Sequence, residues 1–118
     1  MSGDIIDLPE VLERVQNDKD LLLELFDIFE DDFQKKRQAL GAAVAAGDFV
    51  KIKEATHSMK GSSGNLSAKS MHAACLQLEQ LAKSSSTAGM ADLINTIDGQ
   101  FEQIKVFAAR LKKQWTGG

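Results

Sequence analysis

The sequence predicts an all-α protein, an antiparallel up-and-down four-helix bundle with a short additional helix at the N-terminus. Three observations support this. The 118 residues contain only one proline, whereas alanine, leucine, lysine, glutamate and glutamine, which favour helices, are abundant. Apolar residues recur at intervals of three and four, and no stretch alternates like a strand for more than a few residues. The predicted connections are too short for crossovers, so successive helices should run antiparallel within a single domain over residues 1–118, with its core at about 5–115.

The first helix is expected to be short, over about residues 8–16. Pro9 lies in its first turn, where the missing N–H of proline breaks no helical hydrogen bond. Asn17 and Asp18 should then end this helix and cap the next one. The apolar residues of the first helix have helical spacing: Leu8, Leu12 and Val15.

A long second helix is expected over about residues 19–46. Gly47 is a suitable C-terminal stop, and Asp48 is a suitable N-cap for the following helix. Apolar residues with gaps of mostly three, four and seven form one stripe along it: Leu22, Leu25, Phe26, Phe29, Phe33, Leu40 and Val44.

The third helix should cover about residues 48–63 and end at Gly64-Asn65. Its core positions are Phe49, Ile52, Ala55 and Met59. Ser67 is a plausible N-cap for a fourth helix over about 68–84. The residues of that helix expected to point inward are Met71, Ala74, Cys75, Leu78 and Ala82.

The last helix is expected over about residues 88–115, after a loop of serine and threonine. Gly99 interrupts it at some cost in helix propensity. Its apolar stripe is regular: Met90, Ile94, Ile97, Phe101, Ile104, Ala108, Leu111 and Trp115.

Composition excludes several classes of function. The net charge of −3 gives no basic surface for nucleic acid. No apolar run approaches the ~18 residues of a transmembrane helix, and the N-terminus lacks the pattern of a signal peptide. Cys75 is the one cysteine, so no internal disulfide can form. We therefore expect a cytoplasmic protein that neither enters a membrane nor binds nucleic acid.

The stretch around His57 is the candidate functional site. If this segment is helical, His57, Lys60, Gly61 and Gly64 share one face, because they stand at i, i+3, i+4 and i+7. The roughly opposite face carries Ile52, Ala55, Met59 and Ser62. His57 should therefore point towards water. Each glycine costs a helix up to ~1 kcal/mol relative to alanine, a cost more readily accepted where a partner must approach the backbone.

The sequence contains no complete motif for a metal site or a nucleotide-binding site. Glu54 and His57 match the Glu-x-x-His motif of di-metal bundles, but such a site needs a second copy, and His72 has Lys69 at the corresponding position. The run Gly61-Ser62-Ser63-Gly64 fits neither a nucleophile elbow nor a phosphate-binding loop. We therefore expect no metal, no nucleotide and no cofactor, and Cys75 is expected to be a core residue.

A nucleophilic histidine remains. A neutral imidazole can attack phosphorus and hold the phosphoryl group as phosphohistidine, and Lys60 can offset charge on the phosphoryl oxygens. Gly61 and Gly64 leave room for a partner's active site, which would have to supply the rest of the catalysis. The alternative is a non-catalytic helical-bundle interaction module, in which His57 is an ordinary surface histidine.

The segment His57-Ser58-Met59-Lys60-Gly61-Ser62-Ser63, followed by Leu66 and Ala68, resembles the signature of histidine-containing phosphotransfer (HPt) domains. Leu78-Glu79 falls where that family often has a hydrophobic residue followed by glutamate or glutamine. The resemblance extends over about residues 5–113. It implies a phosphocarrier without kinase activity, which relays a phosphoryl group between a hybrid sensor histidine kinase and the receiver domain of a response regulator.

The resemblance also implies roles for individual residues. His57 would be the phosphorylated histidine, Lys60 would contact the phosphoryl group, and Gly61 would let the receiver dock closely. Glu79 would lie near His57 and would belong, with Lys53, Gly61 and Gly64, to the surface that meets the partner. Lys53 is also a candidate contact near the phosphoryl group. Magnesium would be bound by the receiver, and a bundle of this size would be a monomer.

Three positions depart from the family pattern. Met59 replaces leucine, a conservative exchange, and Ser67 replaces glycine before the fourth helix. Glu79 stands where some members have glutamine. Its negative charge would shorten the lifetime of the phosphohistidine, or would instead pair with Lys60 or Lys83.

Overall fold

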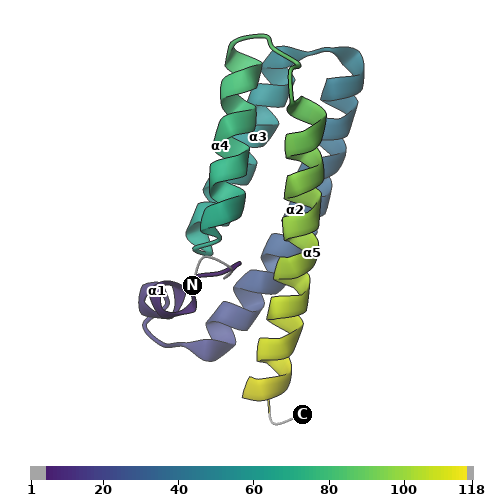
Figure 1. Ribbon diagram of the computed structural model, residues 1–118. Coiled ribbons are helices and arrows are strands. Elements are labelled where there is room, and N and C mark those ends of the chain that lie inside the picture. Colours follow the sequence, from purple (N-terminus) through teal and green to yellow (C-terminus); the bar gives the residue numbers. More distant parts are fainter. Residues whose placement is uncertain (1–4, 117–118) are drawn as a thin grey trace.

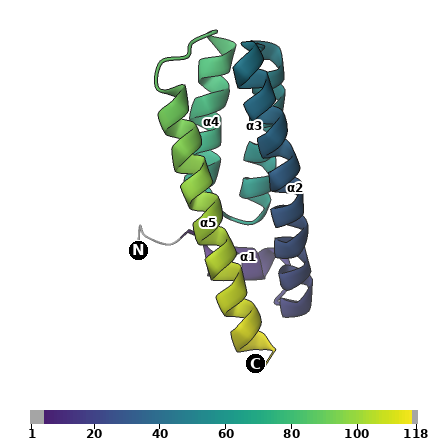
Figure 2. The ribbon, with the colours of Figure 1, turned by 90° about the vertical axis from the view of Figure 1, so that its right-hand side faces the viewer.

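The computed structural model describes residues 5–116, and five α-helices account for most of them (Figure 1). Their bounds are α1 Leu8–Arg14, α2 Lys19–Ala46, α3 Phe49–Asn65, α4 Lys69–Lys83 and α5 Met90–Trp115. Helices α2 to α5 form the predicted antiparallel bundle. α2 and α5, with 28 and 26 residues, are much longer than α3 and α4, with 17 and 15. Both views show α1 lying crosswise at the end where the shorter pair stops (Figures 1 and 2).

Aspartate side chains cap the first three helices. Asp7, Asp18 and Asp48 each accept a hydrogen bond from the backbone N–H three residues later, at 3.2, 3.0 and 3.1 Å. Gly47 ends α2 in the left-handed conformation, with φ of 65°. The sequence therefore predicted the boundary between α2 and α3 correctly, because aspartate and glycine have distinct roles at helix ends.

The turn between α3 and α4 differs from the prediction. α3 continues through Gly64 to Asn65, two residues past the expected end. Ser67 is not an N-cap: the cap of α4 is Ala68, which makes no side-chain capping bond. Ser67 instead adopts a φ of 58°, the left-handed conformation that glycine adopts without strain. This explains why glycine suits the position better than a capping residue does.

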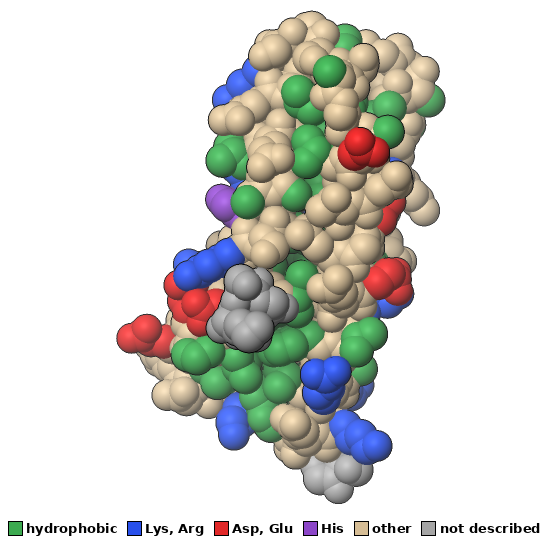
Figure 3. All heavy atoms as spheres, in the orientation of Figure 1, with side chains coloured by type: hydrophobic (Ala, Val, Ile, Leu, Met, Phe, Trp, Pro, Cys, Tyr) green, Lys and Arg blue, Asp and Glu red, His purple; other side chains and the backbone are tan. Residues whose placement is uncertain are grey.

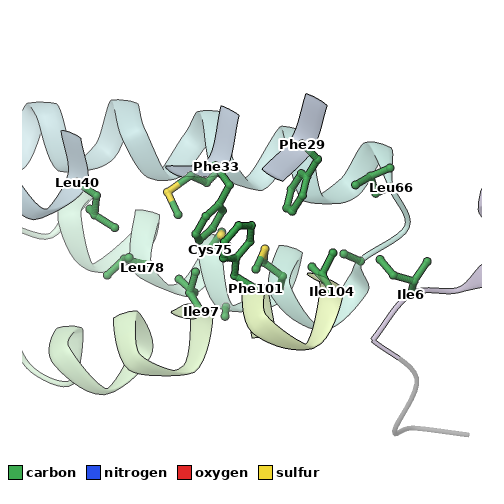
Figure 4. Packing of buried hydrophobic residues seen from close by; sticks show 14 of the residues in the cluster. Ile6, Phe29, Phe33, Leu40, Leu66, Cys75, Leu78, Ile97, Phe101 and Ile104 are labelled. Atoms are coloured by element: carbon green, nitrogen blue, oxygen red, sulfur yellow. The ribbon is translucent and has the colours of Figure 1, made fainter. Parts of the chain in front are cut away.

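The core lies between the four long helices and is rich in phenylalanine. The rings of Phe33 and Phe101 are stacked with centroids 4.0 Å apart, and Phe29 lies 5.9 and 6.1 Å from them (Figure 4). Cys75 is buried in the same cluster, as predicted, and burial raises the pKa of its thiol to about 12. The inward stripe of α5 is confirmed from Met90 to Leu111, whereas Trp115 is only partly buried. On α2, however, Ala43 is buried and Val44 is 36% exposed.

The end of the bundle near α1 is held by polar and apolar contacts. The Asp7 N–H donates to the Ser67 carbonyl at 3.0 Å, and Lys69 pairs with Asp7 at 3.2 Å and with Glu10 at 3.1 Å. Hydrophobic side chains gather at this lower end on the face drawn in Figure 3. Several partly buried residues of α1 and α5 pack against the core: Leu8, Leu12, Phe107 and Trp115. α1 thereby fixes the turn that joins α3 to α4.

None of the helices within residues 5–116 is both long enough and apolar enough to cross a lipid bilayer.

Candidate functional site

His57 lies near the middle of α3 and points outward, with 69% of its side chain exposed. The residues of α3 that face the core are Ile52, Thr56, Met59 and Ser63. Their spacing of four, three and four places His57 beside the boundary with α4. The prediction that the imidazole faces water is therefore confirmed.

The antiparallel pairing of α3 and α4 brings Glu79 directly beside His57. The Glu79 side chain is only 4% exposed, and its two oxygens have different partners. Oε2 lies 2.9 Å from Nδ1 of His57, and Oε1 accepts a hydrogen bond from Nζ of Lys60 at 2.8 Å. One buried carboxylate thus holds both the imidazole and the ammonium group in place.

The charge on Glu79 determines which nitrogen of His57 carries the proton. The hydrogen bond from Lys60 lowers the pKa of Glu79, and the bond from His57 acts in the same direction, against the opposing effect of burial. Glu79 is therefore ionised at neutral pH and can only accept hydrogen bonds. Nδ1 of His57 must donate to it. In the neutral ring the lone pair then lies on Nε2. Nε2 is therefore the nitrogen of this exposed side chain that can react.

The two glycines of the predicted face have different surroundings. A Cβ added to Gly61 would meet none of the neighbouring atoms of residues 5–116 within 4 Å, so the surface that these residues form beside His57 is open there. A Cβ on Gly64 would lie 3.0 Å from Nδ1 of His72. That nitrogen is also 3.0 Å from the Lys60 carbonyl oxygen and donates to it. Packing against His72 is thus sufficient to explain Gly64, whereas no contact within the described residues explains Gly61.

The other predicted site residues are placed as follows. Lys53 is exposed on α3, one turn before His57. Glu79 was predicted to be among the residues that meet a partner. Its side chain is buried, so it cannot contact a partner directly and can act only through His57 and Lys60. No three His, Cys, Asp or Glu side chains within residues 5–116 lie close enough to hold a metal ion. Glu54 and His57 are both exposed.

Sequence reasoning missed two buried polar residues beneath the site. Thr56 and Ser63 are fully buried, and their hydroxyls donate to the backbone carbonyls of Lys53 at 3.0 Å and Met59 at 2.9 Å. Ser62 was expected opposite His57, near the core, but it contacts Lys36 of α2 at 2.8 Å. The signal was available, since Thr56 and Ser63 stand seven residues apart and in phase with Ile52.

Comparisons with known proteins agree with this geometry. Residues 24–107 match the family model described as Hpt domain. The crystal structure of histidine-containing phosphotransfer protein B (HptB) from Pseudomonas aeruginosa PAO1 is similar, with a TM-score of 0.86 and 26% identity over 95% of this chain and 97% of that chain. A search of curated proteins found no significant match. Hpt domains relay phosphoryl groups between kinases and receivers and are not kinases themselves. The chain belongs to this family and is a histidine-containing phosphotransfer domain of a phosphorelay.

Proposed function

We propose that His57 is the residue that carries the phosphoryl group, and that the group is bound to Nε2. The hydrogen bond between His57 Nδ1 and the buried Glu79 carboxylate is the observation that supports this most strongly. It fixes the ring in the tautomer whose lone pair is on the outer nitrogen. A helical bundle that served only as an interaction module would have no need for a buried charge beneath an exposed imidazole, because burying an ionised group is unfavourable unless it is well paired.

The proposed transfer is a direct displacement at phosphorus. The Nε2 lone pair of His57 attacks the phosphorus of an aspartyl phosphate on the receiver domain. The bond from phosphorus to the aspartate oxygen breaks, and the aspartate leaves as a carboxylate. The proton on Nδ1 stays in place. The reverse reaction returns the phosphoryl group to the receiver, so the domain needs no nucleotide and no catalytic base of its own.

Lys60 is the proposed contact for the phosphoryl oxygens. Its Nζ is fixed by Glu79 one helical turn from His57, and its side chain remains 22% exposed. A positioned ammonium group stabilises the negative charge that is shared among the equatorial oxygens during transfer. Magnesium is expected on the receiver, where it would neutralise the remaining charge. Lys53 is a second candidate for this role because it is exposed on the same face of α3.

The proposed docking surface covers the exposed faces of α2 and α3 beside Gly61. Ile28 on α2 and Val50 on α3 are apolar side chains with exposed fractions of 62% and 64%, which a docked partner would cover. A shallow pocket of about 150 Å³ lies between the two helices, lined in part by Ile28, Asp32 and Asn65. We propose a receiver domain and a hybrid sensor histidine kinase as the partners, met in the cytoplasm by a monomeric domain.

The experiment is to incubate the protein with a receiver domain that has been loaded from acetyl phosphate, and to measure its intact mass at neutral and acidic pH. We expect one added phosphoryl group that is lost in acid. The adduct should be absent in His57→Ala and present in His72→Ala, the matched variant of the second histidine. An adduct that persists in His57→Ala, or none with any of several receivers, would contradict the proposal.

A further inference from the structure

Glu79 lies where it can act on His57 after phosphorylation, a role that rests on the proposed phosphorylation of His57. Within the described residues, the charged or titratable side chains that contact its carboxylate are Lys60 and His57, both from α3. Lys60 occupies Oε1, which leaves Oε2 for Nδ1 of His57. The carboxylate is almost fully buried, so water cannot readily replace either partner.

We propose that Glu79 is a positioning residue that keeps the proton on Nδ1 of His57 after phosphorylation as well as before it. The phosphorylated ring is thereby held in its cationic, reactive form at neutral pH. The consequence is a phosphohistidine that transfers quickly and has a short lifetime in water.

The protonation of Nδ1 in the phosphorylated ring depends on its contact with Oε2 of Glu79. With the phosphoryl group on Nε2, an unprotonated Nδ1 would direct its lone pair at a buried carboxylate oxygen 2.9 Å away. Two acceptors at that distance repel each other, and the negative charge would lose one of its two partners. A protonated Nδ1 donates to the carboxylate and carries a compensating positive charge. The geometry therefore favours the protonated ring.

The protonated ring is also the better leaving group. When a receiver aspartate or a water molecule attacks phosphorus, the N–P bond breaks and its electron pair returns to Nε2. A ring that retains Nδ1–H then departs as neutral imidazole, and no further proton is needed. A ring without that proton would have to leave as the imidazolate anion or be protonated during the step. Glu79 thus assists every transfer away from His57, including hydrolysis.

A glutamine at this position would act differently. Its side-chain amide is neutral and can present either its oxygen or its NH₂ group to Nδ1. Because Lys60 can only donate, the amide oxygen would face Lys60 and the NH₂ group would face Nδ1, so the variant no longer favours the protonated ring. Glu79→Gln keeps the size of the side chain, removes its charge and replaces one acceptor oxygen with a donor group.

The test is to phosphorylate the protein with phosphoramidate, remove the reagent and follow loss of the adduct by intact mass between about pH 6 and 9. We expect the adduct of Glu79→Gln to last roughly tenfold longer than that of the unaltered protein at neutral pH. A hydrogen bond to a charged acceptor is stronger than one to a neutral acceptor, and the difference corresponds to a factor of about ten in rate. Loss should also slow more steeply with rising pH in the variant. Glu54→Gln is the matched control, because Glu54 is an exposed glutamate of α3 one turn before His57; its adduct should decay like that of the unaltered protein.

A second measurement reads the proton directly. In protein labelled with ¹⁵N-histidine, the NMR spectrum of phosphorylated His57 should show a protonated Nδ1 in the unaltered chain and an unprotonated one in Glu79→Gln at neutral pH. Equal lifetimes together with equal Nδ1 signals would overturn the role of Glu79 while leaving phosphorylation of His57 intact.

If Glu79→Gln takes up no phosphoryl group, the tautomer of unphosphorylated His57, read from the same NMR spectrum, tests the inference. Loss of the Nδ1–H tautomer in the variant, in whole or in part, supports the inference, and a single Nδ1–H tautomer overturns it. A lack of any adduct on the unaltered protein would instead count against His57 as the carrier.

Discussion

Gly64 and His72 fit against each other so closely that a methyl group on residue 64 would lie 3.0 Å from Nδ1 of the imidazole. The same nitrogen donates to the Lys60 carbonyl at 3.0 Å and so links α3 to α4 one turn from His57. The absence of a side chain at Gly64 therefore makes room for a hydrogen bond between two helices. The open surface at Gly61, only three residues earlier, has no such explanation within the bundle.

Alanine substitutions should separate these two glycines. Gly61→Ala should stabilise the protein by up to about 1 kcal/mol, because it improves helix propensity and meets no neighbour. Gly64→Ala should show no gain or a loss, because His72 must move and its hydrogen bond, about 1 kcal/mol, is weakened. Urea denaturation followed by circular dichroism gives both values. In a His72→Ala background the substitution at Gly64 should become favourable; equal stabilisation by the two single variants would refute the packing argument.

Gly61→Gln should reduce transfer much more than stability. The bundle can accommodate the longer side chain, since no neighbour in the part of the chain that the structure describes lies within 4 Å of the Cβ position. A docking receiver would meet it directly beside His57. We expect the rate of phosphoryl transfer from a loaded receiver to fall at least about tenfold, a barrier increase of about 1.4 kcal/mol, with an unfolding midpoint equal to or above that of the unaltered protein.

The matched control for that variant is Gly99→Gln. Gly99 is also exposed, helical and without a neighbour at its Cβ position, but it lies on α5. It should transfer at the rate of the unaltered protein. Equal rates in all three proteins would mean that the receiver does not approach α3 at Gly61.

Lys60→Met should destabilise the protein at neutral pH by about 1–3 kcal/mol, because it leaves the buried carboxylate of Glu79 with one partner fewer. Lys60 is the main reason that the pKa of Glu79 is lowered in the folded protein. A lowered folded pKa contributes stability above the unfolded value, about 4.3, and that contribution is lost as pH falls through the folded pKa. The difference between the two proteins should therefore shrink in acid.

Denaturation curves measured from neutral pH down to about pH 3 test this sign. Lys35→Met is the control: Lys35 pairs with Asp31 at 3.4 Å with both side chains about three-quarters exposed, so its loss should cost less than about 0.5 kcal/mol. A destabilisation by Lys60→Met that is independent of pH would show that Glu79 does not depend on it.

Ser67→Gly should stabilise the protein by about 1 kcal/mol. A non-glycine residue in the left-handed conformation is strained by about 1–2 kcal/mol, and glycine relieves this strain. The greater freedom of glycine in the unfolded chain offsets part of the gain. Ser67→Ala keeps the Cβ and should show no such gain. Thermal unfolding of the two variants decides the matter: if alanine and glycine shift the melting temperature equally, backbone strain is not the cause.

Much of this fold could be predicted because its signals are local. Helix periodicity predicted five helices to within about two residues, and it placed His57 on the exposed side of α3. The positions that the sequence did not predict depend on how two helices meet. Burial of Glu79 requires the register between α3 and α4, and the role of Gly64 requires the ring of His72, which lies on the other helix.

Ser67 illustrates a different limit. Serine next to a helix start is usually a cap, and local rules therefore assigned it to that role. The left-handed φ of 58° results from the tight connection between α3 and α4 and from the hydrogen bond between the Ser67 carbonyl and Asp7. Helix periodicity carries no information about such a contact. The family that the sequence resembles has glycine at this position, which fits a left-handed backbone, but serine was expected there as a cap.

The central claim is that the domain passes its phosphoryl group on through His57, and return transfer tests it most directly. The phosphorylated protein is freed of donor, mixed with an unphosphorylated receiver and magnesium, and both intact masses are followed over time. We expect the receiver to gain the phosphoryl group as this protein loses it, much faster than the adduct decays alone. Loss at the same rate with and without receiver, to water only, would contradict a relay.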